Sequence, residues 1–588
     1  MVNFKEDEKL NVLNHSCAHL LAQAVKHLYP QAKFWVGPVV EEGFYYDIDL
    51  GDQVITDEDL EKIEREMKKC SKAAKNIIRK EITKEEALEM FKDDEYKIDL
   101  ISRMDDENQV ISCYQQGDFT DLCRGPHMAN TKEVKYFKLT KFSGAYWKGD
   151  ANNKMLQRIY GVCFPTQEEL DAYLKEVEEQ KQRDHRKIGK DLEIFMVSDL
   201  VGKGMPMYLP NGYFIWEQLE NYIKGKEKEL GYLHVLTPPL GNVELYKTSG
   251  HWDHYKENMF PMMEVEGEQF VLRPMNCPHH MVIYSNGVHS YRDLPIRIGE
   301  IARDCRFETS GSLKGIERVR TFCQNDAHLF VTPEQIEDEI SSVVNLILDV
   351  YKQLDIKNFR FELSLRDPED KVKYYPDDEM WNNAENKLRE VLTDLGYEFV
   401  EKIGEAAFYG PKLDVQVKPA VGPEYTLSTC QLDFCLPMRF DLGYIDKDGS
   451  KKTPVVIHRA ILGSIDRFMA FYLEETKGYL PAWLAPKQVC VLPVNNEYHL
   501  EYAKAVSEKL EKAGFRVNLD SRNEKLGYKL REAVVKKIPY MLILGQKEVD
   551  DEKISYRRAG SEETTTITID EFIKLLNDDV VNKTRYDV

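Results

Sequence analysis

The stretch DCRFETSGSLKGIERVRTFCQNDAHLF, residues 304–330, decides the fold of the central part of this 588-residue chain. It is predicted as strand, loop and strand, because two β-type runs flank the turn-rich TSGSLKG. Arg306 precedes the turn, and Arg318 and Arg320 follow it. Arginine binds phosphate through paired hydrogen bonds and keeps its charge when desolvated. A hairpin with arginines at its base therefore predicts a site for a bent nucleoside triphosphate.

Two further segments point to the same chemistry, RPMNCPHH (273–280) and VIHRAILGSIDRF (456–468). The second runs from a strand into a helix through Gly463 and puts Arg467 in the first turn of that helix. Backbone N–H groups and the helix dipole favour anions there. A single arginine is by default a solvated surface charge, but three such segments together favour a phosphate site. Neither a G-x-x-x-x-G-K-[ST] loop nor a strand followed by G-x-G-x-x-G is present.

Around these segments the pattern predicts a multidomain α+β protein. Strand-type runs with few helices between them indicate a large antiparallel sheet, at residues 270–273, 296–307, 317–323, 413–418, 425–435 and 454–459. The last hundred residues alternate strands and helices, which is typical of a small parallel-sheet α/β domain. Thr166 and Glu169 form a capping box that starts a long linker helix. We predict four parts: residues 1–165, the linker 166–190, 191–485 and 486–588.

Composition limits the alternatives. The formal net charge of -21 neither indicates nor excludes RNA as a ligand, because basic groups can be confined to local tracts. No run approaches 18 apolar residues, so no membrane span is expected. The start, MVNFKEDEKL, lacks the apolar core of a secretory signal, and the eleven cysteines contain no CxxC pair. We expect reduced thiols and a cytoplasmic protein.

The three central segments resemble the second and third sequence motifs of class II aminoacyl-tRNA synthetases. The helix at 212–230 with GYLHVLTPP after it resembles the first motif, with Pro238 as its proline. The resemblance implies a homodimer interface at the first motif and ATP bound with magnesium. It implies that Arg306 binds the α-phosphate and Arg467 the γ-phosphate side. Arg318 is expected where the loop returns toward the triphosphate.

The central segments, together with TSGHWDHYKENMF (248–260), AFYGPKLD (407–414) and CQLDF (430–434), resemble threonyl-tRNA synthetases. This implies one catalytic zinc per subunit, held by Cys277, His328 and His458. A lone cysteine is by default a buried hydrophobe, but one thiolate and two imidazoles leave a fourth zinc position open for substrate. Threonine could bind the metal through its amino and hydroxyl groups. Valine lacks that oxygen and would be rejected more strongly than the roughly 10²-fold of an apolar pocket.

By the same resemblance, Asp326 accepts from the threonine hydroxyl, and Lys412 pairs with the carboxylate or the α-phosphate. The pocket is lined by Gln324, Tyr409 and Gln431.

The sequence departs from the family pattern at two positions. His279 replaces the glycine of PMNCPGH, and Thr426 stands where a glutamine is common. We expect altered packing beside the metal from the first and altered contacts to the adenosine from the second.

The N-terminal part carries two pairs of chemically active residues at a spacing of four, His15 with His19 and Cys123 with His127. One pair alone is more often a polar helix face. Both pairs resemble the editing domain of the threonyl enzymes, which is related to that of the alanyl enzymes. The resemblance implies hydrolysis of seryl-tRNA by water activated through these side chains, with Asp121 orienting one of them. Related domains bind zinc, but we favour a metal-free site. Serine lacks only a methyl, worth about 1–3 kcal/mol, so a second site is needed.

The C-terminal part resembles an anticodon-binding domain through SRNEKLGYKLRE, GQKEV and ISYRR. The residues expected to contact bases and backbone are Asn523, Arg531, Glu548 and Arg557. Many family members begin with a small ubiquitin-like domain, which we do not expect here because the sequence starts almost directly at the editing domain. The main prediction is a threonine–tRNA ligase with threonine tRNA, ATP and threonine as substrates. A prolyl- or seryl-type synthetase and a non-catalytic synthetase-like RNA-binding protein are the alternatives.

Overall fold

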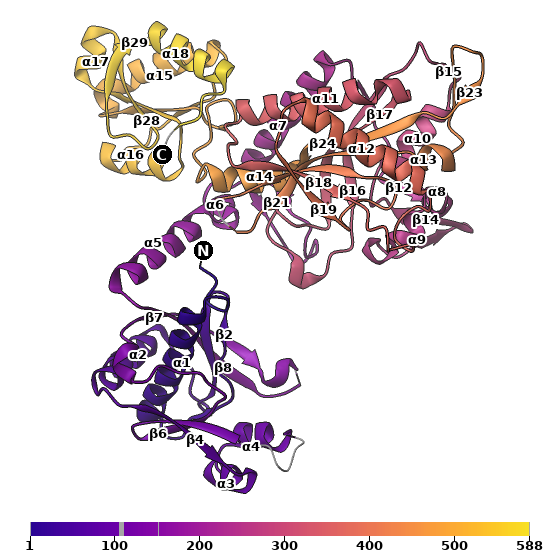
Figure 1. Cartoon of the computed structure of the whole chain (residues 1–588). Helices are drawn as coiled ribbons and strands as arrows, with labels where there is room; N and C mark the ends of the chain where they lie inside the picture. Colours follow the sequence, from indigo (N-terminus) through magenta and orange to yellow (C-terminus); the bar gives the residue numbers. More distant parts are fainter. Residues whose placement is uncertain (1, 105–110, 151, 421, 587–588) are drawn as a thin grey trace. The chain divides into compact units, whose positions relative to one another are not determined.

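The computed structural model describes residues 2–104, 111–150, 152–420 and 422–586. It divides into two compact units, Met1–Glu179 and Gln180–Val588, and the division falls inside α5 (Gln167–Arg183) (Figure 1). The predicted capping box starts this helix, because Thr166 N donates to Glu169 Oε2 at 3.1 Å and Glu169 N donates to Thr166 Oγ1 at 3.2 Å. Within the described ranges, no helix combines the length and apolarity needed to span a bilayer.

The first unit packs α1 (Glu8–Leu28) against an antiparallel sheet. Asp7 caps α1 by accepting from the backbone of Lys9 and Leu10. The sheet has the order β1-β3-β8-β7, with β2 paired to β3, and its strands are β1 (Lys33–Phe34), β2 (Val39–Val40), β3 (Gly43–Asp49), β7 (Tyr136–Tyr146) and β8 (Met155–Phe164). A second sheet, β4 (Ile77–Ile82), β5 (Ile111–Gln116) and β6 (Phe119–Leu122), follows α2 (Asp57–Lys72) and is joined by α3 (Lys84–Met90) and α4 (Glu95–Ser102).

The second unit is built on an eight-stranded sheet, in the order β11-β16-β17-β24-β21-β20-β18-β19. The strands are β11 (Leu233–His234), β16 (Ile296–Cys305), β17 (Thr321–Val331), β18 (Phe359–Leu365), β19 (Phe399–Ile403), β20 (Lys412–Val417), β21 (Tyr425–Asp433) and β24 (Val455–Ser464). The predicted antiparallel sheet is confirmed for its centre. The two outer pairs, β11–β16 and β18–β19, are parallel, because long connections that include helices join their strands.

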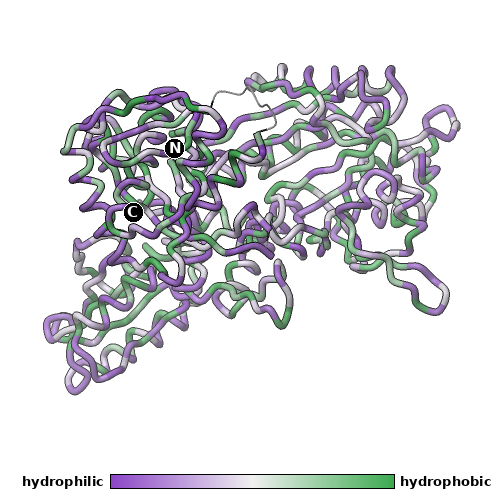
Figure 2. Tube along the Cα trace, turned by 90° about the horizontal axis from the view of Figure 1, so that it is seen from below, coloured by the Kyte–Doolittle hydropathy of each residue, from purple (hydrophilic) through white to green (hydrophobic). Residues whose placement is uncertain are grey.

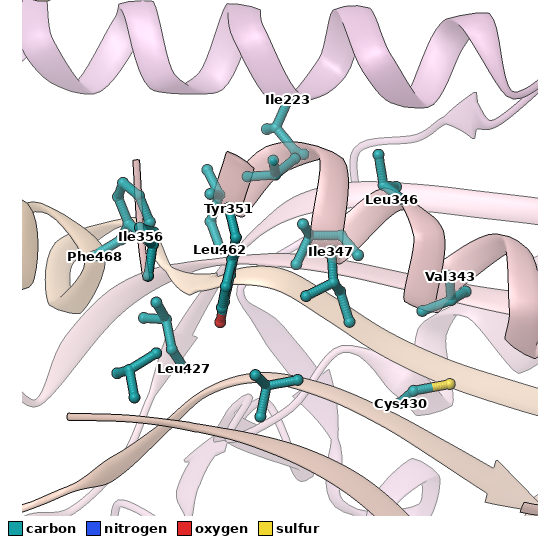
Figure 3. Close-up of a cluster of buried hydrophobic side chains, with 14 of the residues drawn as sticks. Ile223, Val343, Leu346, Ile347, Tyr351, Ile356, Leu427, Cys430, Leu462 and Phe468 are labelled. Atoms are coloured by element: carbon teal, nitrogen blue, oxygen red, sulfur yellow. The ribbon is translucent and has the colours of Figure 1, made fainter. Parts of the chain in front are cut away.

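The expectation of few helices in this region was wrong, since α11 (Ile336–Gln353) and α12 (Asp378–Asp394) cover the sheet. The apolar residues of α11 recur every three or four positions and so form one buried face. Figure 3 shows Val343 and Ile347 of this face above Leu427 and Cys430 of the sheet. This layer holds the strands in place from behind and leaves the opposite face for a site.

Other helices and strands of the second unit precede the C-terminal sheet and differ in length. They are α6 (His185–Asp191), α7 (Pro210–Glu229), α8 (Val243–Ser249), α9 (His251–His254), α10 (Cys277–Ser285), α13 (Cys435–Arg439), α14 (Ile465–Glu475) and the strands β9 (Phe195–Met196), β10 (Met207–Tyr208), β12 (Leu240–Asn242), β13 (Met263–Val265), β14 (Glu268–Leu272), β15 (His289–Ser290), β22 (Tyr444–Ile445) and β23 (Lys451–Lys452).

The C-terminal sheet has the order β26-β25-β27-β28-β29. Its first three strands are parallel, as predicted, whereas β28 and β29 are antiparallel. Its elements are β25 (Val489–Pro493), α15 (Asn496–Lys512), β26 (Val517–Leu519), α16 (Leu526–Val535), β27 (Tyr540–Leu544), α17 (Gln546–Asp551), β28 (Lys553–Arg558), β29 (Thr565–Thr568) and α18 (Ile569–Asn582). Hydrophobic and hydrophilic residues alternate along the trace (Figure 2), as expected when each element buries one face.

Candidate functional site

The register of the large sheet places four predicted site residues in one row. Lys412 of β20 pairs with Gln431 of β21, and Gln431 pairs with His458 of β24. His458 in turn pairs with His328 of β17. Directly opposed residues in antiparallel strands project to the same face, so this row crosses four strands on one side of the sheet. Residues as distant in sequence as His328 and His458 become neighbours in this way.

Cys277 completes a group of three possible metal ligands. The ligand atoms of Cys277, His328 and His458 all lie within 4.8 Å of one another, and all three residues are buried. Cys277 is the first residue of α10, which packs with β17 and β24 in a separate apolar cluster. Three donors of the types that zinc prefers therefore converge from one helix and two strands.

Both imidazoles are oriented by hydrogen bonds on the nitrogen that is not needed for a metal. Nδ1 of His328 lies 2.8 Å from Nδ1 of His280, and Nε2 of His280 lies 3.1 Å from Oε2 of Glu300. Nε2 of His458 lies 2.7 Å from Oδ2 of Asp433. Carboxylates that fix the tautomer of a ligating histidine in this way are typical of metal sites. No sequence pattern indicated Glu300, and His280 and Asp433 were noted only as members of RPMNCPHH and CQLDF.

The buried Nε2 of His328 has no hydrogen-bond partner among the described residues. An unsatisfied buried nitrogen costs about 1–3 kcal/mol, and a cation at this position would satisfy it. Burial, with the nearby charges of His458 and His280, holds the pKa of His328 well below 6.5, so the ring is neutral and able to ligate. Burial also raises the pKa of the Cys277 thiol well above 9.0. Without a cation this sulfur stays protonated, because nothing offsets the cost of a buried thiolate.

Asp326 lies beside this group. It stands two residues before His328 on β17, and its Oδ2 is 3.8 Å from His328 Nε2. Gln324 stands two residues earlier again, so the three side chains share one face of the strand. Burial, followed by the charge of Asp304, raises the pKa of Asp326 well above 3.8.

The row continues into an open cleft of about 540 Å³. Seven of the predicted residues line it: Arg306, Arg318, Gln324, Tyr409, Lys412, Gln431 and Arg467. The ring of Tyr409 stacks on His458 at 5.0 Å between centroids, and its hydroxyl donates to Gln431 Oε1 at 2.7 Å. The cleft and the three-ligand group are thus adjacent. Lys412 Nζ donates to Asp414 Oδ2 at 2.6 Å, a partner that was not predicted.

The three arginines of the cleft are held by the protein itself. Arg306 Nε donates to the Pro274 carbonyl at 3.2 Å, and its guanidinium lies 4.9 Å from the centre of the Phe322 ring. Arg318 pairs with Glu308 at 2.9 Å. A cluster of cations in one cleft is stabilised by a polyanion and repelled without one.

Arg467 occupies the first turn of α14, as predicted. Ser464 caps the helix by accepting from Arg467 N, and Arg467 Nε donates to the Glu317 carbonyl at 3.1 Å. Burial lowers the pKa of the Arg467 guanidinium from its usual value. Gly463 precedes the cap with a φ of +60°, and a Cβ there would lie 2.4 Å from the Leu427 carbonyl oxygen. Only glycine fits this turn.

The two departures from the family pattern both lie next to the site. Thr426 lines the cleft, and its hydroxyl accepts from Gln416 Nε2 at 2.9 Å. His279 is buried beside Cys277, and burial lowers the pKa of His279 to about 4.

The N-terminal unit brings its predicted residues together as well. The ligand-type atoms of His15, His19, Cys123 and His127 lie within 4.8 Å of one another. Cys123 Sγ is 3.1 Å from Nε2 of His15 and 3.2 Å from Nε2 of His127. α1 supplies the first two residues, and the segment after β6 supplies the others. Burial raises the pKa of the Cys123 thiol to about 12, which describes a neutral thiol among neutral rings.

Asp121 contacts more side chains than the sequence predicted. Its Oδ2 is 3.8 Å from His19 Nε2, whereas its Oδ1 lies 2.6 Å from the buried Lys97 Nζ. Tyr46 also donates to this carboxylate. Burial lowers the pKa of His19 well below 6.5, and the charges of His15 and Lys97 lower it further. Lys97 and Tyr46 were missed because no spacing relates them to the histidines.

Of the four residues expected to contact the anticodon, Asn523 lies in the segment between β26 and α16, and the others lie in α16, α17 and β28. Asn523 and Arg531 are exposed. Glu548 already accepts from Gly545 N at 2.9 Å and from Ser555 Oγ at 2.6 Å, and Arg557 Nε donates to Thr564 Oγ1 at 2.8 Å. Asn523 and Arg531 are therefore accessible to solvent, whereas Glu548 and Arg557 already make hydrogen bonds within the domain.

Comparison with family models defines the class of protein. Residues 260–476 match the model "tRNA synthetase class II core domain (G, H, P, S and T)". Residues 488–579 match an anticodon binding domain, and residues 111–160 match the second additional domain of threonyl and alanyl tRNA synthetases. With the antiparallel sheet and the arginine cleft, these matches define a class II aminoacyl-tRNA synthetase.

Similar curated proteins identify the family within this class. A threonine–tRNA ligase of Geobacillus kaustophilus is 57% identical over 578 residues, which cover 98% of this chain and 88% of the relative. One of Staphylococcus aureus is 55% identical over 576 residues, covering 98% and 89%. This chain belongs to the threonine–tRNA ligase family.

Solved structures agree with this family. A structure described as the RNA binding domain of threonyl-tRNA synthetase from Cryptosporidium parvum is 38% identical with a TM-score of 0.63, covering 67% of this chain and 98% of that one. A putative threonyl-tRNA synthetase from Aeropyrum pernix is 29% identical with a TM-score of 0.61, covering 69% and 98%.

Proposed function

We propose that this protein attaches threonine to threonine tRNA at the expense of ATP. The observation that carries the proposal is the convergence of Cys277, His328 and His458 beside a cleft lined with arginines. In the first step a threonine carboxylate oxygen attacks the α-phosphorus of ATP, and pyrophosphate leaves. In the second, the hydroxyl of the terminal adenosine of the tRNA attacks the resulting mixed anhydride and AMP leaves. Magnesium accompanies the ATP.

The arginines act on the triphosphate. Arg306 is assigned to the α-phosphate and Arg467 to the γ-phosphate side, with Arg318 on the returning arm of the loop. Preorganised cations aimed at developing charge provide much of the rate enhancement in such transfers. Lys412, paired with Asp414 at the edge of the cleft, is assigned to the threonine carboxylate or the α-phosphate.

Cys277, His328 and His458 fit a zinc ion. The fit rests on the donor set, on the unpartnered Nε2 of His328 and on the carboxylates that orient both rings. Zinc held by these three residues would be open to coordination by the amino and hydroxyl groups of threonine, since a catalytic zinc can expand from four to five ligands. Asp326 is assigned to accept from that hydroxyl, and Tyr409 and Gln431 are assigned to the wall of the threonine pocket; the proximity of Asp326 to His328 and the Tyr409–Gln431 hydrogen bond support this.

A second activity is assigned to the N-terminal unit, hydrolysis of seryl-tRNA. The match to the second additional domain and the packing of Cys123 against three histidines support it. The neutral imidazoles can accept a proton from an attacking water, and Lys97 holds Asp121 at the edge of the group. We propose that this site works without a metal.

We further propose a homodimer formed through α7 and the segment after it, and anticodon contacts by Asn523, Arg531, Glu548 and Arg557. A prolyl- or seryl-type synthetase and a non-catalytic relative are disfavoured by the family to which the chain belongs.

Pyrophosphate exchange with a panel of amino acids tests the main proposal. Exchange that depends on threonine, weakly on serine and not on valine or proline is expected. Exchange driven best by proline, or absent with every amino acid, would refute it.

A further inference from the structure

His185 is a fully buried polar residue at the start of α6, outside every group discussed so far. Its ring contacts two other segments of the second unit. Nδ1 lies 2.6 Å from Oε1 of Glu474 in α14. Nε2 accepts from the backbone N–H of Ile316 at 3.3 Å. Ile316 belongs to the returning arm of the arginine loop, two residues before Arg318.

These two contacts determine the tautomer of the ring. Nε2 must carry a lone pair, because its partner is a backbone donor. The proton is therefore on Nδ1, which donates to Glu474. Nδ1 is thus the donor and Nε2 the acceptor. The other neutral tautomer would lose the hydrogen bond from Ile316.

The arginine loop and α14 are also joined by a second contact, beside the cleft. Glu317 follows Ile316, and its carbonyl accepts from Arg467 Nε at 3.1 Å. Arg467 lies in the first turn of α14, and Glu474 lies in the last turn of the same helix. His185 therefore connects the loop that carries Arg318 with the helix that carries Arg467. Because His185 contacts both the arginine loop and α14, it constrains the distance between these two segments.

The close approach of the loop to the ring supports the same view. Gly315 has a φ of +51°, and a Cβ on it would lie 2.1 Å from His185 Nε2. The loop can thus reach the imidazole only because residue 315 has no side chain. Gly311, in the same loop, has open space around the corresponding position.

We propose that His185 is a positioning residue for ATP, which holds the returning arm of the arginine loop against α14. It touches no substrate and acts through Ile316 and Glu474. This inference rests on the proposed binding of triphosphate by Arg318 and Arg467.

Two conservative variants separate the contacts. In His185→Asn the amide nitrogen replaces Nδ1, so the bond to Glu474 is kept and the bond to Ile316 is lost. In His185→Gln the amide oxygen can replace Nε2 and accept from Ile316, while the amide nitrogen can replace Nδ1 and donate to Glu474, so both contacts can be kept. We expect His185→Asn to raise the KM for ATP about tenfold, the size of one ordinary hydrogen bond, with the KM for threonine unchanged. His185→Gln should stay close to wild type.

Gly315→Ala tests the contact from the loop, and Gly311→Ala controls for a methyl group added elsewhere in the same loop. The first should reproduce the rise in the KM for ATP, and the second should not. Equal changes in both KM values, or an unchanged KM for ATP in both His185→Asn and Gly315→Ala, would overturn the proposal.

Hydrogen exchange at the Ile316 amide gives a readout that does not need activity. Exchange should be faster in His185→Asn and in Gly315→Ala, but not in Gly311→Ala. Unchanged exchange in His185→Asn contradicts the contact itself. Faster exchange with an unchanged KM for ATP would instead leave the contact intact and refute its link to ATP. Wild-type protein that shows no threonine-dependent exchange of pyrophosphate would mark a failure of the proposed function, not of this contact.

Discussion

His328 and His458 are directly paired residues of β17 and β24, with ring centroids 4.5 Å apart. The register of two central strands therefore brings both imidazoles to the same point. A slip of one residue would turn one ring to the opposite face of the sheet. The large apolar layer under α11 opposes such a slip, because it too depends on the register. The core and the candidate metal site are thus specified by the same strand pairing.

The contact of His280 with His328 leads to a first prediction. His280→Phe removes the hydrogen bond that orients the ring of His328 but retains a buried aromatic side chain. Loss of such an orienting partner typically weakens metal binding about 10–100-fold. We expect this loss in a competition titration with a chromogenic zinc chelator.

Glu300→Gln is the companion variant, since a glutamine oxygen can still accept from His280 Nε2. Burial raises the pKa of Glu300, but hydrogen bonds from His280 and Thr237 and the charge of Arg273 lower it to about 2. The wild-type acceptor is therefore a carboxylate, and the neutral amide should cost less zinc affinity than His280→Phe. Zinc affinity that is unchanged in both variants would show that the contacts from Glu300 through His280 do not orient the ring of His328.

Cys277→Ala leads to a second prediction, about the number of metal ions. We expect one zinc per wild-type chain, none in this variant, and no threonine-dependent exchange of pyrophosphate. The sulfur is one of three ligands, and two imidazoles alone hold zinc weakly. Elemental analysis of the purified protein measures the stoichiometry. One zinc remaining in the variant would locate a metal at the His15 and Cys123 group, contrary to our proposal, and near-normal exchange would defeat the zinc assignment.

The sequence predicted much of this site, but by resemblance to a family more than by local pattern. Cys277, His328 and His458 follow no ligand-spacing rule, because a sheet register joins them. The alternation of Gln324, Asp326 and His328 along one strand was the one local signal available. The orienting carboxylates Glu300 and Asp433 could not be found, since buried acids on strands have many structural roles.

Local sequence patterns likewise predicted only part of the fold. Strands β16 and β17 follow from their turn-flanked runs, and α14 follows from the glycine and serine before it. The parallel pairing of β18 with β19 does not, because it depends on α12 crossing over between them. α11 was missed because few helices were expected between the strands of this region, although its apolar spacing is regular.

The third prediction concerns Arg467→Lys. The single ammonium of lysine cannot donate to Glu317 and bind phosphate with the fixed fork of a guanidinium. We expect the KM for ATP to rise at least about tenfold, equivalent to ~1.4 kcal/mol, while the KM for threonine changes little. Steady-state exchange kinetics with each substrate varied in turn measure both. A larger effect on threonine than on ATP would contradict the assignment to the triphosphate.

The fourth prediction concerns pH. His27 of α1 lies 3.1 Å from both Glu66 and Asp118. Burial lowers its pKa, but hydrogen bonds with Asp118 and Glu66 outweigh this and raise it above 6.5. The stabilisation is therefore fully present below pH 6.5 and is lost as the pH rises through the raised value. For a partly exposed pair it amounts to ~0.3–1 kcal/mol.

Native-state hydrogen exchange in α1 measures this effect. Near pH 5.5, His27→Gln should lower the local free energy of opening relative to wild type, and near pH 8.5 the two proteins should match. A difference that is the same at both pH values would show that the charge of His27 does not contribute.

The last prediction addresses editing through Cys123→Ala. The thiol lies against His15 and His127, at 3.1 and 3.2 Å, so removing it disturbs both rings without changing the cleft of the other unit. We expect more net seryl-tRNA from the variant when serine is supplied, and unchanged activation of threonine. Cys70→Ala is the matched control, a buried cysteine of the same unit outside this group, and it should make no more seryl-tRNA than wild type.

An unchanged yield of seryl-tRNA from Cys123→Ala would reject a role of this thiol in hydrolysis, because the variant would still remove serine from the tRNA at the normal rate. A raised yield in both variants would indicate general destabilisation of the unit, and amide protection in α1 would distinguish that outcome from the loss of one catalytic group.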